Sequence, residues 1–228
     1  MTPFYADDAV TIYHGDCREI LPTLEADALV LADPPYGVNE RTERAKAGRG
    51  RSPYALMIAR DFPRVHGDDQ PFDPAHLLAF KRLVLWGANH YADRLPPSPS
   101  WIVWDKLDGL TSKRELGFND NGDCELAWTN LGGPVRIIPH RWVGLIRASE
   151  KERHRHPTQK PVAVMARIIS AYSKPGDLII APYMGSGPEL VAAKALGRRA
   201  IGIEIAEEYC QVAADRCAQE TLGLEVPA

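Results

Sequence analysis

The sequence contains few cysteines and no long apolar run. Its four cysteines are scattered through 228 residues without a C-x-x-C pair, so neither a disulfide framework nor a zinc site is indicated. No segment approaches the ~20 apolar residues that a membrane span needs. The N-terminus also lacks a basic segment followed by an apolar one. We therefore expect a soluble, cytoplasmic protein with no membrane partner and no bound metal.

An excess of positive charge is also absent, because the formal net charge is −3. A phosphate-binding surface usually appears as net basic charge, so the overall composition does not indicate one. Arginines are nevertheless concentrated in two stretches, and the candidates for phosphate contacts are Arg41, Arg44, Arg49, Arg51, Arg141, Arg153 and Arg155. Charge runs of this kind are often only solvated faces. Both stretches flank the motif described next, which favours phosphate contacts.

The sequence is organised around residues 29–36, Leu-Val-Leu-Ala-Asp-Pro-Pro-Tyr. Four apolar residues predict a buried strand, and two prolines must end it with a stiff turn because they donate no backbone hydrogen bond. The turn fixes Asp33, the Pro35 carbonyl and the Tyr36 ring at the carboxyl edge of a sheet, where ligands of open α/β sheets bind.

This cluster suits methyl transfer to an exocyclic amino group on a planar base. The lone pair of an aromatic amine is delocalised into the ring, which makes the amine a poor nucleophile. The Asp33 carboxylate and the Pro35 carbonyl could each accept an N–H and localise that lone pair, while Tyr36 stacks on the base. The alternative is a strand and a proline turn whose aspartate is only a cap.

The rest of the chain alternates strands and helices, which predicts one α/β domain over residues 1–228. Strands 9–13 and 27–33, joined by a helix over 18–24, are expected to form a parallel pair with Asp16 and Asp33 at the same edge. Further expected elements are helices over 73–81, 157–173, 188–196 and 206–220, and strands over 83–87, 101–105, 124–128, 135–138, 178–183 and 200–205. Residues 37–72 and 106–156 are predicted to contain variable segments for target recognition.

A glycine turn joins the strand over 178–183 to the following helix. Unpaired amides at such a helix N-terminus can meet a polar ligand. Glu204 follows Gly185 by nineteen residues. In dinucleotide-binding folds an acid about 20 residues beyond the glycines binds ribose hydroxyls. The Gly-Lys-Thr/Ser of a P-loop is absent, so the pattern indicates an adenosine-type cofactor.

Three stretches together resemble one family. They are His-Gly-Asp-Cys at 14–17 leading to Asp-Pro-Pro-Tyr at 33–36, His-Pro-Thr-Gln-Lys-Pro at 156–161, and Ala-Pro-Tyr-Met-Gly-Ser-Gly at 181–187. Their order is similar to that of permuted, beta-class DNA amino-methyltransferases, in which the catalytic motif precedes the cofactor motif. Restriction-modification, cell-cycle and phage enzymes belong to that group. The likeness covers residues 9–36 and 154–216.

The resemblance implies an α/β Rossmann-like methyltransferase fold with circularly permuted motifs. Its sheet would be seven-stranded and mostly parallel, with helices on both faces. The implied reaction moves a methyl group from S-adenosylmethionine to the N6 of adenine in double-stranded DNA. Cytosine N4 remains an alternative target, and RNA or a protein glutamine a less favoured one. The sequence leaves a homodimer open.

The family's site residues can be carried over to the matching positions. Asp33, Pro34, Pro35 and Tyr36 correspond to the catalytic tetrapeptide. Asp16 corresponds to the acid that holds the adenine amino group, and Glu204 to the ribose-binding acid. The remaining implied cofactor-binding residues are Cys17, Asp33, Thr158, Gln159, Lys160, Ala181, Pro182, Tyr183, Gly185, Ser186, Gly187 and Ile205.

One departure from the family pattern bears on activity. Ala181 stands where the family usually has an aspartate that helps to hold the charged amino-acid end of the cofactor. Losing a charge-assisted hydrogen bond costs about 1.5–3 kcal/mol, or roughly ten- to hundredfold in affinity. A catalytically weakened relative that only binds DNA is therefore a further alternative. Glu189 also stands where a small hydroxyl residue is common.

Overall fold

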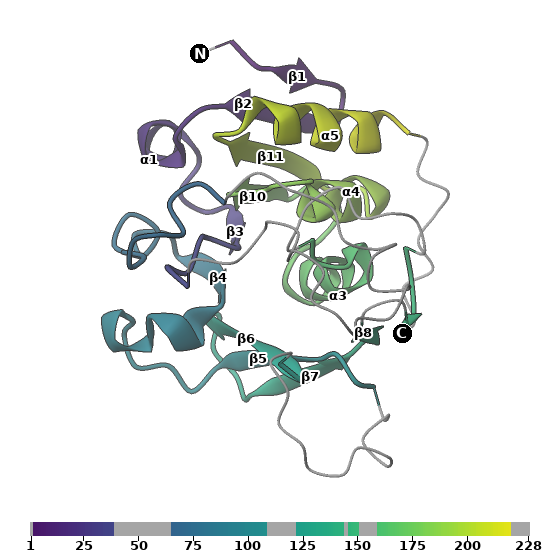
Figure 1. The fold of residues 1–228 in the computed structure, drawn as a ribbon. Coiled ribbons are helices and arrows are strands. Elements are labelled where there is room, and N and C mark those ends of the chain that lie inside the picture. Colours follow the sequence, from purple (N-terminus) through teal and green to yellow (C-terminus); the bar gives the residue numbers. More distant parts are fainter. Residues whose placement is uncertain (1, 39–64, 109–121, 144–145, 151–158, 220–228) are drawn as a thin grey trace, which may run out of the picture.

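The computed structural model describes residues 2–38, 65–108, 122–143, 146–150 and 159–219. Its central element is a nine-stranded sheet with the order β1-β2-β11-β10-β3-β4-β6-β5-β7 (Figure 1). The strands are β1 (Tyr5–Ala6), β2 (Val10–His14), β3 (Leu29–Ala32), β4 (Arg82–Trp86), β5 (Trp101–Asp105), β6 (Cys124–Thr129), β7 (Arg136–Pro139), β10 (Leu178–Pro182) and β11 (Arg199–Glu204). A separate pair is formed by β8 (Trp142–Val143) and β9 (Ile146–Arg147).

The expected Rossmann-like fold is confirmed, and its sheet has more strands than the seven expected. Strands β2, β11, β10, β3 and β4 run parallel to one another. The antiparallel hairpin of β5 and β6 follows, formed by the strands expected over residues 101–105 and 124–128. The two additional strands are β1, antiparallel to β2, and β7, parallel to β5.

The expectation that the strands over residues 9–13 and 27–33 are neighbours in the sheet is wrong. Strands β11 and β10, from the other end of the chain, lie between β2 and β3. A crossover helix requires only that two strands be parallel, and local sequence does not say how many strands separate them. The consequence expected for Asp16 and Asp33 still holds, because all these parallel strands end at the same edge.

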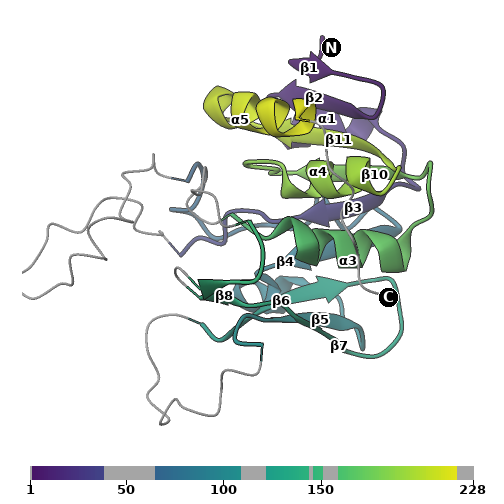
Figure 2. The same ribbon diagram turned by 90° about the vertical axis from the view of Figure 1, so that its right-hand side faces the viewer.

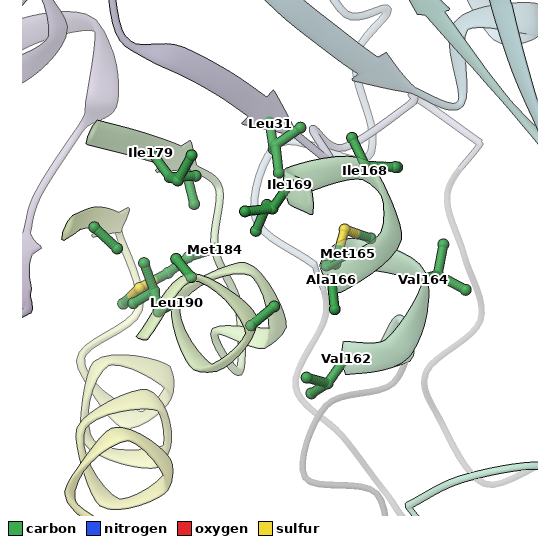
Figure 3. Close-up of a cluster of buried hydrophobic side chains, with 14 of the residues drawn as sticks. Leu31, Val162, Val164, Met165, Ala166, Ile168, Ile169, Ile179, Met184 and Leu190 are labelled. Atoms are coloured by element: carbon green, nitrogen blue, oxygen red, sulfur yellow. The ribbon is translucent and has the colours of Figure 1, made fainter. Parts of the chain in front are cut away.

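Three helices cover one face of the sheet: α3 (Val162–Tyr172), α4 (Pro188–Ala195) and α5 (Glu207–Ala218). Figure 2 shows them side by side along this face. Apolar side chains of α3 meet those of the sheet, as Figure 3 shows for Ile168, Ile169 and Leu31, which are at most 1% exposed. Burying an aliphatic side chain of this size contributes about 1.5–3 kcal/mol. This packing fixes the strand ends and the turns that follow them.

Helix α3 begins later than residue 157, the expected start. Pro161 is its N-cap, with an extended backbone at ψ 135°. A residue that precedes proline avoids the helical region because the proline ring clashes with it. Lys160 therefore lies outside the helix, in an extended segment that passes the end of β3.

The other face is covered by shorter elements, namely α1 (Cys17–Ile20), η1 (Leu21–Thr23), η2 (Ala88–His90) and η3 (Ala92–Arg94). The helix expected over residues 18–24 becomes 3-10 after Ile20, because Pro22 has no N–H for an α-helical bond.

The helix expected over residues 73–81 is wrong, because hydrogen-bonded turns occupy residues 75–79. Asp73 does accept the Ala75 amide, as an N-cap would. However, the α-helical bond from Leu78 to Pro74 is not continued, because the amides of Leu77 and Phe80 bond three residues back, to Pro74 and Leu77. Such a short helix gains little intrinsic stability, and burial of Leu77 and Phe80 holds the turns instead.

Candidate active site

A cavity of about 810 Å³ lies at the carboxyl edge of the parallel strands. This volume is within the range of small-molecule sites, roughly 300–1,000 Å³. Connections leave β10 and β3 in opposite directions along the sheet, and ligands bind at such switch points. Segments at the carboxyl ends of four strands line the cavity: residues 15–18, 33–36, 183–186 and 203–206. Two motifs from opposite ends of the chain thus line one cavity.

Asp33 follows β3 and is held by two side chains. Lys160 Nζ lies 2.7 Å from Asp33 Oδ2, and the Tyr36 hydroxyl donates a hydrogen bond to Asp33 Oδ1. Lys160 Nζ also lies 3.2 Å from the Tyr36 hydroxyl oxygen and 3.1 Å from Glu125 Oε2 on β6. The Lys160 side chain is only 4% exposed. Its ammonium therefore fixes the position of the Asp33 carboxyl from inside the molecule.

The charges in this cluster shift one another's pKa values. Burial alone lowers the pKa of Lys160, but Asp33 and Glu125 together hold that pKa well above its usual range. Burial raises the pKa of the Asp33 carboxyl, and the Lys160 ammonium opposes this effect. The pKa of Glu125 is lowered overall. Burial alone would raise that pKa, but the charges of Lys160 and Lys106 outweigh the effect of burial. Lys160 is therefore the cation that favours an ionised Asp33.

Tyr36 packs on elements that the motif did not reveal. Its ring stacks on His90 with centroids 5.2 Å apart and an interplanar angle of 10°. Gly87, which follows β4 with a φ of 64°, allows this close approach, because a Cβ there would lie 2.0 Å from Tyr36 Cε1. No sequence pattern pointed to His90. A glycine directly after a buried strand was the available signal for Gly87.

Glu204 ends β11 and organises the glycine turn. One carboxylate oxygen accepts the Gly185 amide at 3.0 Å, and the other accepts the Ala206 amide at 2.9 Å. Each oxygen can accept a further hydrogen bond, so capacity for ligand hydroxyls remains. Beside it, Ile205 also lines the cavity and is 38% exposed. This acid next to an exposed apolar side chain suits a ribose joined to a planar base.

Arg216 on α5 holds the same turn from behind. Its guanidinium donates to Ser186 O at 2.7 Å and to Ser186 Oγ at 3.0 Å, and pairs with Glu150 at 2.9 Å. Glu150 in turn accepts the Val162 amide and the Gln159 side-chain amide. The sequence had suggested only an ordinary covering helix here. Arg216 therefore links the glycine turn to the segment that carries Lys160.

Asp16 and Cys17 lie at the cavity wall after β2. Hydrogen bonds from Arg18 lower the pKa of Asp16, so its carboxylate stays ionised. Burial raises the pKa of Cys17 to about 11, which keeps the thiol protonated. Tyr183, whose φ is 61°, also lines the cavity, and its hydroxyl lies 2.8 Å from His76 Nε2. Phe72 packs edge to face on both His76 and Tyr183. No sequence pattern predicted this aromatic cluster.

Some predicted residues do not line the cavity. Ala181 and Pro182 are buried within β10, and Ala181 belongs to the apolar core against the helices. Gly187 is the N-cap of α4, where a Cβ would lie 2.9 Å from Ala213 Cβ. Close packing of α4 on α5 therefore explains why position 187 holds glycine. Gln159 and Lys160 line the cavity, whereas Thr158 lies outside the described residues.

Most of the residues predicted to contact DNA belong to segments that the structure does not describe. Arg41, Arg44, Arg49, Arg51, Arg153 and Arg155 lie outside the described residues. Arg141 is described and does not line the cavity; its guanidinium donates to the Asp108 carbonyl at 3.3 Å.

The comparisons with known proteins agree with this geometry. A family model described as DNA methylase matches residues 120–215. The type II methyltransferase M2.LlaDCHI of Lactococcus lactis subsp. cremoris is 47% identical, over 94% of this chain and 91% of that protein. The chain belongs to the DNA methylase family. The DNA adenine methyltransferase YhdJ of Escherichia coli K12 is 25% identical, over 91% of this chain and 82% of that protein.

Solved structures of DNA methylases share the fold. The M1.HpyAVI complex with S-adenosylmethionine has a TM-score of 0.54 at 22% identity, covering 92% of this chain and 99% of that one. The cytosine-N4-specific PvuII DNA methyltransferase has a TM-score of 0.58 at 15% identity, covering 96% and 90%. The cofactor of this family of DNA-methylating enzymes is S-adenosylmethionine. Within the described part of the chain, no helix is long and apolar enough to cross a membrane.

Proposed function

We propose that this DNA methylase transfers a methyl group to the exocyclic N6 of adenine in double-stranded DNA. The observation that carries the proposal is the shared cavity, in which Asp33 and Tyr36 face the turn organised by Glu204. The similarity to an adenine methyltransferase supports the choice of base. In the enzymes that the sequence resembles, the tetrapeptide begins more often with aspartate when adenine is the target and with serine when cytosine is, so Asp33 supports the same choice.

The catalytic wall is assigned to Asp33, Pro34, Pro35 and Tyr36. A base inside the duplex cannot reach this wall, so it must be flipped out at a cost of about a few kcal/mol. The ionised Asp33 carboxylate and the Pro35 carbonyl accept the two amino hydrogens, and the Tyr36 ring contacts the base. Lys160 positions Asp33 and favours its ionised form. The amino nitrogen then has its lone pair available for attack.

The opposite wall is assigned to the cofactor. Glu204 would accept ribose hydroxyls and Ile205 would contact the adenine ring, while Asp16 would accept the adenine amino group. The residues fit such a ligand, because the ionised Asp16, the Glu204 carboxyl and an exposed apolar side chain line one cavity of suitable size. S-adenosylmethionine supplies an electrophilic methyl group on a sulfonium sulfur. A general base is not required before transfer, and the spare proton can leave to water.

The contacts with DNA remain predictions. We assign phosphate binding to the basic stretches that contain Arg41, Arg44, Arg49, Arg51, Arg141, Arg153 and Arg155, and target recognition to segments around residues 37–72 and 106–156. We also expect one domain over residues 1–228 and a cytoplasmic location, where DNA is accessible. A homodimer stays a prediction that light scattering of the purified chain can test.

One experiment tests the proposal. Duplex DNA is incubated with the protein and methyl-labelled S-adenosylmethionine, digested to nucleosides, and the labelled nucleoside is identified. We expect N6-methyladenosine in its deoxy form, and none from Asp33→Ala. Labelled N4-methylcytosine would favour the alternative supported by the PvuII enzyme's fold. Binding of DNA without any labelled product or cofactor affinity would favour the weakened relative.

A further inference from the structure

Glu189 is a buried acid that the assigned roles do not use. It is the second residue of α4 and lines the cavity, yet the residue is only 3% exposed. Its Oε2 atom has no hydrogen-bond partner. An unsatisfied buried acceptor destabilises the protein, because it has lost its hydrogen bonds to water. Because Glu189 lines a ligand cavity, a hydrogen-bond donor on the ligand can satisfy this acceptor.

The other acids that line the cavity are already engaged or exposed. Asp33 is paired with Lys160, Asp16 with Arg18, and Glu204 accepts two backbone amides. Asp68 accepts two backbone amides, Asp73 accepts one, and Glu208 is exposed. Within the described part of the chain, Glu189 is thus the cavity acid that combines deep burial with an unpaired oxygen.

The charges around Glu189 do not supply a contact ion pair. Burial raises its pKa to about 8, and Asp33 acts in the same direction. The backbone amide of Glu189 itself opposes this effect most, followed by Lys160 and Arg216, but neither of these two cations has a hydrogen bond or ion pair with Glu189 in the structure. Lys160 is held by Asp33, and Arg216 is held by Glu150. A cation that enters with the ligand would therefore find the Oε2 atom of Glu189 without a competing cation.

We propose that the Glu189 carboxylate receives the α-ammonium group of the methionine end of S-adenosylmethionine. The ligand carries two cationic centres, but only the ammonium has N–H groups that can satisfy the unpaired oxygen. The sulfonium has no hydrogen to donate. A charge-assisted hydrogen bond of this kind is about twice as strong as a neutral one. The inference rests on the proposal that this cavity holds the cofactor.

The position of Glu189 also accounts for the alanine in the glycine motif. Ala181 contributes no carboxylate to the cavity, because its side chain is buried in the apolar core. Glu189 contributes one from the first turn of α4, and a negative charge is favourable at a helix N-terminus. The charge that the family usually places at the end of β10 is therefore provided from the neighbouring helix. On this basis Ala181 does not mark a weakened enzyme.

The test compares three ligands that differ in one group at a time. Dissociation constants are measured by calorimetry for S-adenosylmethionine, for S-adenosylhomocysteine, which lacks the sulfonium, and for methylthioadenosine, which lacks the amino-acid end. We expect Glu189→Gln to weaken the first two by roughly ten- to hundredfold, with methylthioadenosine unchanged. Glu207→Gln on α5 is the charge-matched control, because Glu207 is exposed and does not line the cavity.

Other patterns overturn the inference. A loss confined to S-adenosylmethionine would assign Glu189 to the sulfonium, and an equal loss for all three ligands would indicate a purely structural role. Equal dissociation constants for the unmodified chain and for Glu189→Gln would show that Glu189 does not contact the ligand. Absence of binding to the unmodified chain would refute the cofactor assignment of the cavity itself.

A second measurement follows the release of a proton from the Glu189 carboxyl when the ligand binds. Since the Glu189 carboxyl has a pKa of about 8 in the free protein, ammonium binding near neutral pH should displace its proton. Calorimetry of S-adenosylhomocysteine binding in buffers of different ionisation enthalpy measures that proton. We expect proton release from the unmodified chain and not from Glu189→Gln. Equal proton release from both proteins would contradict the proposal.

Discussion

Lys160 Nζ lies 2.7 Å from Asp33 Oδ2, although 127 positions separate the two residues in the sequence. The contact joins the end of β3 to the extended segment before α3. It places a buried cation next to the acid to which we assign the amino group of the target base. Removing one member of a buried pair leaves the other uncompensated, which costs about 3–5 kcal/mol.

We expect Lys160→Met to slow methylation in a pH-dependent way. Without the ammonium, burial and the nearby Glu125 raise the pKa of Asp33 further, and only the hydrogen bond from the Tyr36 hydroxyl still opposes them. More of the acid is then protonated at a given pH, and a protonated carboxyl is a weaker acceptor for the amino hydrogen. The acidic limb of the single-turnover rate profile should therefore move to higher pH. Lys81→Met is the control, because the Lys81–Asp27 pair is exposed on both sides. An unshifted profile for Lys160→Met would remove the positioning role.

We expect Gly87→Ala to impair catalysis through Tyr36. The new Cβ would lie 2.0 Å from Tyr36 Cε1, so the ring must leave its place on His90. Gly132→Ala is a matched control, since Gly132 has a φ of 75° but nothing lies within 4 Å of its Cβ position. Both variants should lose a similar backbone contribution of about 1 kcal/mol, measured by urea unfolding. Only Gly87→Ala should lose most of its methylation rate, and parallel losses would contradict this reasoning.

We expect Arg216→Gln to weaken cofactor binding more than it slows the chemical step. The guanidinium orients Ser186 in the glycine turn and does not line the cavity. Its loss should raise the KM for S-adenosylmethionine roughly tenfold while kcat changes little, since hydrogen bonds to a charged group contribute about 1.5–3 kcal/mol. Arg199→Gln on the exposed part of β11 provides the comparison. A fall in kcat at unchanged KM would argue against a role in shaping the turn.

We expect Glu189 to make the ligand-free protein less stable as pH rises. Its pKa is raised from 4.5 to about 8 in the folded state, so in that interval the folded state holds a proton that the unfolded state has lost. The contribution is therefore complete below pH 4.5 and disappears as pH passes about 8. The free energy of unfolding, measured by urea at several pH values, should decline less in Glu189→Gln. A steeper decline in that variant would reverse the predicted sign.

Much of the fold could be predicted because its signals are local. Runs such as Leu29–Ala32 and Leu178–Pro182 are apolar throughout, as strands buried on both faces require. Two prolines follow the first strand after Asp33, and a glycine follows the second at Gly185. These residues end the strands, so the positions of Asp33 and Gly185 followed from the sequence. The spacing from Gly185 to Glu204 likewise predicted that both belong to one ligand site, whereas the hydrogen bond between them was found only in the structure.

Only the tertiary structure decided which of these ends meet. The insertion of β10 and β11 between β2 and β3 depends on packing between distant segments, and local sequence carries no record of strand neighbours. The same holds for Glu125 beside Lys160 and for Arg216 behind Ser186, since each pair is brought together by folding. The sequence thus determined which groups stand at the strand ends. The order of the strands determined which groups share a cavity, because that order fixes which side chains lie within reach of one ligand.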